Sequence, residues 1–169
     1  MDKVNIVTAT TCKGPAKQEA AGKWLIEYIH DGEVSTKDGI LYRESITGNE
    51  LTLQLLTNAV YVVSKSDVLF DTVEVRLDQK VIASAFMNKW IDNWKENDWK
   101  NSKGDDVANA ETWKKLYSIM DSTAKRFIVT DHRSRYTDWL KYEAQKRLEV
   151  VKSKRELMEK LKKEEEKYV

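Results

Sequence analysis

The chain has 169 residues, 41% of them apolar, which suits one compact domain with its own hydrophobic core. Its 29 basic and 28 acidic residues nearly cancel, so any contact with nucleic acid must come from a local patch. Cys12 stands alone and excludes an internal disulfide, and the N-terminal sequence lacks the apolar run of a signal peptide or a membrane span. We therefore expect a cytoplasmic location and no membrane partner.

The first half of the chain predicts three strands followed by a helix. The β-branched segment 4–11 is typical of a buried strand. Segments 23–30 and 40–45, separated by turn-rich residues, predict an antiparallel meander. From Asn49 onward apolar residues recur at helical spacing, with Thr47 or Asn49 available as the N-cap.

The second half predicts alternating strands and helices. Segment 71–77 alternates like a strand, and one helix is expected to carry residues 82–94. A further helix is expected after a cap at Asn109, then a short strand at 127–129, then an uninterrupted helix over 137–169. This order predicts an α/β fold with a five-stranded mixed sheet, three strands antiparallel and two parallel, flanked by helices and ending in a long C-terminal helix.

Four tryptophans, Trp90, Trp94, Trp99 and Trp113, occur at specific spacings in the middle of the chain. With the residues between them, they are similar without a gap to the helix, basic protrusion and following helix of bacterial ribonuclease HI. The resemblance extends over about positions 4–145. It implies a ribonuclease H-like fold and hydrolysis of the RNA strand of an RNA/DNA hybrid with two Mg²⁺ ions.

Two adjacent Mg²⁺ ions require clustered carboxylates, because hard cations prefer oxygen ligands and their charges must be balanced. At the family's acidic positions the chain has Ala9 instead of the first acid and Thr52 instead of the second. Asp78 matches the third, and Asp138 or Glu143 could supply the fourth. The resemblance therefore predicts an incomplete site.

The segment Asp131-His132 follows the last predicted strand, where the family has a mobile histidine that assists proton transfer or product release. His132 is either that residue or a surface histidine without a catalytic part. The resemblance leaves Asp78, His132 and Glu143 as catalytic candidates. The candidate ligands for Mg²⁺ or Mn²⁺ are Asp78, Asp131 and Glu143.

Residues 95–107 correspond to the family's basic handle, which binds the DNA strand. Three lysines face four acids there, so the segment has a net charge of three minus four, or −1. The handle has therefore lost the charge that favours phosphate binding. The tryptophans are more typical of a packed core than of a stacking platform. Candidate nucleic-acid contacts are Trp99, Lys95, Lys100, Lys103 and Arg133.

Residues 146–169 are expected to form a charged helical extension to a ribonuclease H-like domain over 1–145. Leu157, Met158 and Leu161 lie there among blocks of alternating charge. The extension is either a solvated tail supported by pairs four residues apart or a helix that binds a partner or self-associates.

The combined pattern predicts a ribonuclease H-like protein with a degenerate active site. It would be weakened or inactive as a nuclease and would bind an RNA/DNA hybrid, another structured nucleic acid, or a protein through its C-terminal helix. The alternative is a divergent enzyme, dependent on Mg²⁺ or Mn²⁺, that uses Asp78, Asp131, His132 and Glu143.

Overall fold

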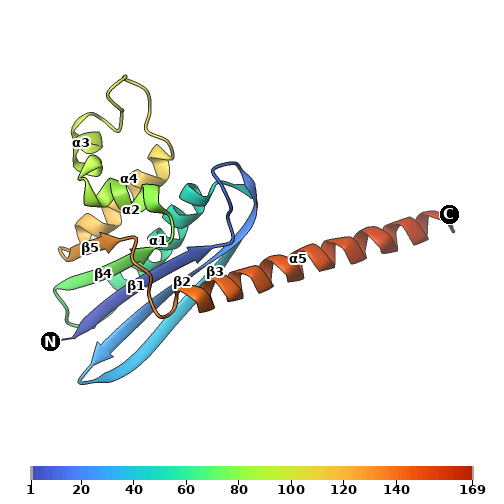
Figure 1. Cartoon of the computed structure of the whole chain (residues 1–169), viewed down its shortest axis with the longest axis horizontal. Coiled ribbons are helices and arrows are strands. Elements are labelled where there is room, and N and C mark those ends of the chain that lie inside the picture. Colours follow the sequence, from blue (N-terminus) through green and yellow to red (C-terminus); the bar gives the residue numbers. More distant parts are fainter. Residues whose placement is uncertain (1, 169) are drawn as a thin grey trace.

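A computed structural model describes residues 2–168, which form one five-stranded sheet and five helices (Figure 1). In chain order the elements are β1 (Lys3–Thr10), β2 (Gln18–His30), β3 (Glu33–Ile46), α1 (Gly48–Ser64), β4 (Thr72–Leu77), α2 (Lys80–Met87), α3 (Trp90–Glu96), α4 (Ala110–Ser122), β5 (Arg126–Thr130) and α5 (Thr137–Glu166). The strand order is β3-β2-β1-β4-β5, with β1, β2 and β3 antiparallel and β1, β4 and β5 parallel. The predicted fold class is confirmed.

Strand β1 lies at the centre of the sheet, and both of its faces are buried. Its side chains alternate as a pleated strand requires. Val4 and Ile6 belong to the large core on the α1 side, whereas Val7 and Ala9 pack with Leu140 of α5. The central strand therefore separates two layers of helices.

The hairpin of β2 and β3 extends farther than predicted. Its tight turn at Asp31-Gly32 has positive φ at both residues, which matches the right-handed twist of the flanking strands. The turn keeps the two strands paired from His30 and Glu33 onward. The residues at the start of β3 are exposed and polar, so no apolar alternation marked this part of the strand in the sequence.

Helix α1 contributes the largest part of the core. The hydroxyl of Thr47 accepts a hydrogen bond from the backbone N–H of Glu50 at 3.2 Å, so Thr47 is the N-cap. Leu51, Leu55 and Leu56 are fully buried in the cluster that fills the space between α1 and the sheet. The apolar residues whose spacing predicted this helix form its packing face.

The single helix predicted over 82–94 is wrong, because the chain breaks between α2 and α3 at Lys89, which has a φ of 58°. Phe86 and Trp94 would lie about 12 Å apart along the axis of a continuous helix. The break lets both rings pack on Trp113, at centroid distances of 5.5 and 5.6 Å. Tertiary packing of three aromatic rings thus overrides helical continuity.

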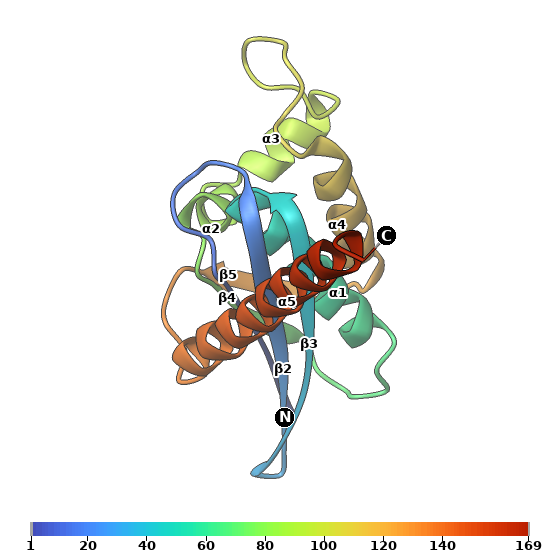
Figure 2. The ribbon, with the colours of Figure 1, turned by 90° about the vertical axis from the view of Figure 1, so that its right-hand side faces the viewer.

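Helix α5 crosses the sheet on the side opposite α1 and then leaves the domain (Figures 1 and 2). Leu140, Ala144 and Leu148 form its buried row. Leu148 lies beyond the expected boundary at residue 145 and packs with Ala21, so the packed part of α5 is longer than expected. Within residues 2–168, no helix is both long and apolar enough to cross a membrane.

Candidate functional site

The carboxyl ends of β1 and β4 lie side by side at the centre of the sheet. Because the two strands are parallel neighbours and the chain leaves them in opposite directions, this edge is where α/β sheets commonly place a site. The backbone N–H of Thr10 donates to Oδ2 of Asp78 at 2.9 Å. This bond fixes the Asp78 carboxyl against the end of β1.

Asp78 is largely buried. Burial raises the pKa of its carboxyl above the ordinary value, outweighing the Thr10 hydrogen bond and the charge of Lys141, which both lower it. Among the described residues, Oδ1 of Asp78, Oε2 of Glu50 and the hydroxyls of Thr8 and Thr52 are buried without a protein hydrogen-bond partner. Uncompensated polar atoms of this kind are rare in cores and are typical of functional sites.

Ala9, which stands where the family has its first acid, is fully buried in an apolar cluster with Val7, Leu25 and Leu140. It is paired across the sheet with Lys23 of β2. The surroundings of Ala9 are therefore apolar and basic, with no clustered carboxylates.

Thr52 is fully buried on α1, and its neighbour Glu50 does not replace the missing acid. Oε1 of Glu50 accepts hydrogen bonds from the hydroxyl of Thr112 at 2.6 Å and from Gln54 at 3.2 Å. These contacts turn the carboxylate toward α4, so Glu50 ties the two helices together.

Glu143 lies on α5 between two lysines. Its carboxylate is 3.8 Å from Nζ of Lys23 and 3.4 Å from Nζ of Lys146. Lys23 is almost buried, forms a further ion pair with Asp38 at 3.4 Å, and lies 4.4 Å from the centre of the Trp139 ring. Glu143 is thus already balanced by ammonium groups.

The loop between β5 and α5 carries Asp131 and His132. Asp131 is partly exposed and His132 is exposed; the backbone N–H of His132 donates to Thr130 at 3.4 Å. In the same loop Arg133 forms an ion pair with Asp138, one of the two candidates for the fourth acid. Because β4 and β5 are parallel, these residues lie at the same end of the fold as Asp78, with Arg133 and Asp138 paired to each other.

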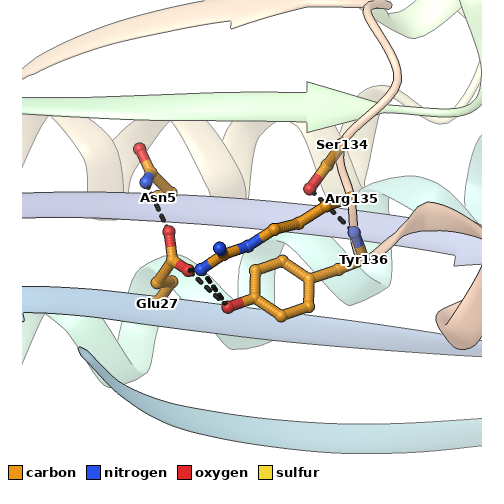
Figure 3. Close-up of polar contacts among 5 residues, drawn as sticks. All are labelled: Asn5, Glu27, Ser134, Arg135 and Tyr136. Atoms are coloured by element: carbon orange, nitrogen blue, oxygen red, sulfur yellow. Dashed lines mark hydrogen bonds and ion pairs between the residues drawn. The ribbon is translucent and has the colours of Figure 1, made fainter.

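Glu27 of β2 anchors this loop to the sheet (Figure 3). Its carboxylate accepts from Asn5 at 2.8 Å, from Arg135 at 2.6 Å and from the Tyr136 hydroxyl. Burial raises the pKa of Glu27, but these three hydrogen bonds outweigh it and hold the pKa below the ordinary value. Glu27 therefore positions the segment that precedes α5.

The sequence analysis missed Glu27. One signal was available, since Glu27 follows Leu25 by two residues and so shares its buried, α5-facing side of the strand. A charged residue at an inward position of an apolar strand requires buried partners. Its partners could not be named, because Arg135 lies 108 residues away in the chain.

The side chains present do not fit a two-metal centre. Within residues 2–168, no three His, Cys, Asp or Glu side chains converge in a way that could hold a metal ion. The expected set of Asp78, Asp131 and Glu143 is not brought together. Asp78 is a carboxyl fixed at the ends of the central parallel strands, and a single carboxyl cannot balance the charge of two divalent cations.

Lysines in and beside the protruding segment between α3 and α4 contact other side chains of the protein. Lys100 forms an ion pair with Asp106 at 2.6 Å, and Lys95 donates to the Tyr117 hydroxyl at 3.0 Å. Lys103 is exposed and has no carboxylate partner among the described residues. Of the three lysines predicted to contact nucleic acid here, Lys100 has a carboxylate partner, Lys95 has the Tyr117 hydroxyl, and Lys103 has neither kind of partner among the described residues.

Trp99 is buried against α4, and its role as a nucleic-acid contact stays a prediction. It is 8% exposed, and its ring packs edge-on against Tyr117 at a centroid distance of 5.9 Å. The physical reason is the turn at Asp98 and Trp99, where two positive φ angles fold the indole back onto α4. Burial of its apolar surface stabilises the protrusion.

A cleft opens beside Asp78 where the loop after β1 meets the N-termini of α1 and α2. Its lining comprises Cys12, Gly14, Pro15, Thr47, Gly48, Asn49, Gln79 and Val81. A Cβ at Gly48 would lie 3.0 Å from the Gln79 side chain and 3.1 Å from Cys12, so glycine permits the close approach of these segments. The positive ends of two helix dipoles favour an anionic ligand, although the Thr47 hydroxyl already accepts one N–H of the α1 terminus.

A ribonuclease H of Legionella pneumophila, strain Corby, is 30% identical over 117 residues, which cover 69% of this chain and 75% of that relative. This chain belongs to the ribonuclease H family. A ribonuclease H of Clostridium botulinum, strain Hall, is 28% identical over 128 residues, or 76% of this chain and 82% of the relative. No protein-family model matches the chain.

Solved ribonuclease H structures share the fold. The N-terminal ribonuclease H domain of a Mycobacterium tuberculosis protein, fused to maltose-binding protein, superposes with a TM-score of 0.63 at 14% identity, covering 89% of this chain and 99% of that one. LC11 ribonuclease H1 in complex with an RNA/DNA hybrid superposes with a TM-score of 0.59 at 18% identity, covering 84% and 96%. The ribonuclease H resemblance of the tryptophan-containing middle is thus confirmed.

Proposed function

We propose that this ribonuclease H-family protein has lost efficient hybrid cleavage and acts as a binding module for an RNA/DNA hybrid or another structured nucleic acid. The observation that carries the proposal is the composition of the site at the carboxyl ends of β1 and β4. Asp78 is its one fixed carboxyl, and Ala9 and Thr52 occupy positions where the family has acids. We expect the protein to act in the cytoplasm.

Charge balance supports the loss of cleavage. Two Mg²⁺ or Mn²⁺ ions carry four positive charges, which a single buried carboxyl cannot offset. The other acids near this edge are engaged: Glu143 by Lys23 and Lys146, and Glu50 by Thr112. Recruiting either one would break contacts that hold α5 or α4 in place.

The cleft beside Asp78 supports nucleic-acid binding. Lys13 and Lys17 are exposed on the loop that forms one wall, and neither pairs with a carboxylate among the described residues. Asn49 and Gln79 add amide groups at the two helix N-termini. Since the chain has a net charge of only +1 and few lysines face the cleft, we expect weak binding with a shallow dependence on salt.

Binding and cleavage of a labelled RNA/DNA hybrid, measured together at low salt with Mg²⁺ or Mn²⁺, test the proposal. We expect binding without appreciable cleavage, weakened several-fold by Lys17→Glu. Lys37→Glu, the same charge change in the distant β2–β3 hairpin, serves as the control and should leave binding unchanged. Strong cleavage abolished by Asp78→Asn would instead support the divergent metal-dependent ribonuclease that uses Asp78, Asp131, His132 and Glu143.

A second candidate function is protein binding through α5, favoured by exposed apolar side chains on a helix that leaves the domain. If the hybrid does not bind even at low salt, nucleic-acid recognition is wrong and protein binding becomes the leading function. Unchanged affinity after neutralising Lys95, Lys100, Lys103 and Arg133 would show that neither the former handle nor the loop before α5 takes part.

A further inference from the structure

The last part of α5 has no packing partner within the domain. All residues from Lys152 to Tyr168 are exposed, and the helix projects away from the sheet (Figure 1). Among the described residues, the ion pair between Arg155 and Glu19 is the last contact that ties it back. Even so, Leu157 and Met158 are each 57% exposed and Leu161 is 47% exposed.

These apolar side chains lie on one face of the helix. At about 100° per residue, Val150, Val151, Leu157, Met158, Leu161 and Tyr168 fall within an arc of about 120°, which we call the α5 stripe. The stripe is rotated by about 90° from the row of Leu140, Ala144 and Leu148 that packs on the sheet. The two faces meet at Val151, which is half-buried, but the stripe from Leu157 onward is exposed, and the domain's own packing does not account for it.

Two charged residues, Lys154 and Glu165, lie within the same arc. We propose that the α5 stripe binds the α5 stripe of a second copy of this chain in an antiparallel pair. In that arrangement Lys154 faces Glu165 of the second copy, and Met158 faces its Leu161. Val151 faces the second copy's Tyr168, which lies just beyond the last helical turn.

Charge selects the antiparallel direction. A parallel pair would place Lys154 against Lys154 and Glu165 against Glu165, and like charges at a helix interface are destabilising. The antiparallel pair matches each Lys154 with a Glu165, and it brings Met158 against Leu161 and Val151 against Tyr168. It also places the two domains at opposite ends of the paired helices.

The free segment spans only four to five helical turns, so we expect weak, concentration-dependent association. This inference names the partner for the second candidate function and does not depend on nucleic-acid binding. Sedimentation equilibrium of the full chain without nucleic acid therefore tests it alone. A monomer at every concentration would overturn the inference and leave the nucleic-acid proposal standing.

Charge reversal gives the sharpest test. Lys154→Glu and Glu165→Lys should each raise the dimer dissociation constant at least about fivefold, because each creates two like-charge pairs. A mixture of the two variants should recover association, since both contacts of the mixed dimer become opposite in charge. The double variant should also dimerise, because the exchanged charges still match.

Matched controls separate the stripe from general charge effects. Lys163→Glu and Glu156→Lys make the same charge changes on the opposite side of the helix and should leave dimerisation unchanged. Met158→Asp should reduce it strongly without unfolding the domain, since this side chain contacts solvent. If dimerisation persists in the Met158→Asp variant, or is unaffected by the single charge reversals, the proposed antiparallel pairing of the α5 stripe is wrong.

Discussion

The two faces of the sheet are built differently. On the α1 side, one continuous apolar cluster joins the sheet with α1, α2 and α4. On the α5 side, two small apolar clusters are separated by charged groups, including the nearly buried Lys23 and Glu27. The difference indicates that the α1 side holds the fold together, whereas the α5 side uses ion pairs and hydrogen bonds to position α5 and the loop before it.

The largest effect is expected on the α1 side. Leu55→Ala removes a fully buried side chain and should lower the free energy of unfolding by about 3 kcal/mol, because the surrounding helices cannot close the cavity. Leu148→Ala, the matched change on the α5 side, should lower it by about 1–2 kcal/mol, since that residue lies at the edge of the sheet. Equal losses in urea unfolding would contradict the comparison.

Glu27→Gln tests the charged network of the α5 side. We expect a loss of about 1–2 kcal/mol at neutral pH, limited because Arg135 is mostly exposed. The folded-state pKa of Glu27 lies below the unfolded value, so its stabilising contribution is present above the unfolded pKa and is lost as pH falls through the folded pKa. The two proteins should therefore become equally stable in acid, as followed by unfolding at several pH values.

Asp78→Asn should raise the free energy of unfolding, which is the opposite of the effect expected for Glu27→Gln. The folded-state pKa of Asp78 is raised, so the native protein loses stability as pH rises through that pKa, and an amide escapes this loss. The amide oxygen can still accept the Thr10 hydrogen bond. We expect a gain of about 1 kcal/mol at neutral pH that disappears below the unfolded pKa. A loss at neutral pH would show that ionised Asp78 is stabilising.

The smallest effect is expected from shortening α5. We propose that the folded domain needs α5 only through the Leu148 contact, with the remainder acting as an extension. Ending the chain after Ser153 should change unfolding by about 0.5 kcal/mol or less, because the removed residues are exposed. Ending it after Gln145, the predicted boundary, removes Leu148 and should be clearly more destabilising.

Local pattern and identity were enough to predict the framework. The β-branched residues of β1 and the helical spacing after Asn49 indicated the order of the elements, and the spacing of the four tryptophans carried the family resemblance. The absence of carboxylates at Ala9 and Thr52 could also be identified from the sequence alone, because it depends only on which residue occupies each position. Short-range propensities and residue identities act within a few neighbours, and the sequence states them directly.

The tertiary structure decided which charges remain available. Glu143 pairs with Lys23, Glu27 collects partners from two distant segments, and Trp99 folds back onto Tyr117. The break at Lys89 likewise depends on the shared ring of Trp113. Each of these outcomes depends on contacts between residues far apart in the chain, and burial fixes them only once the sheet and helices have assembled.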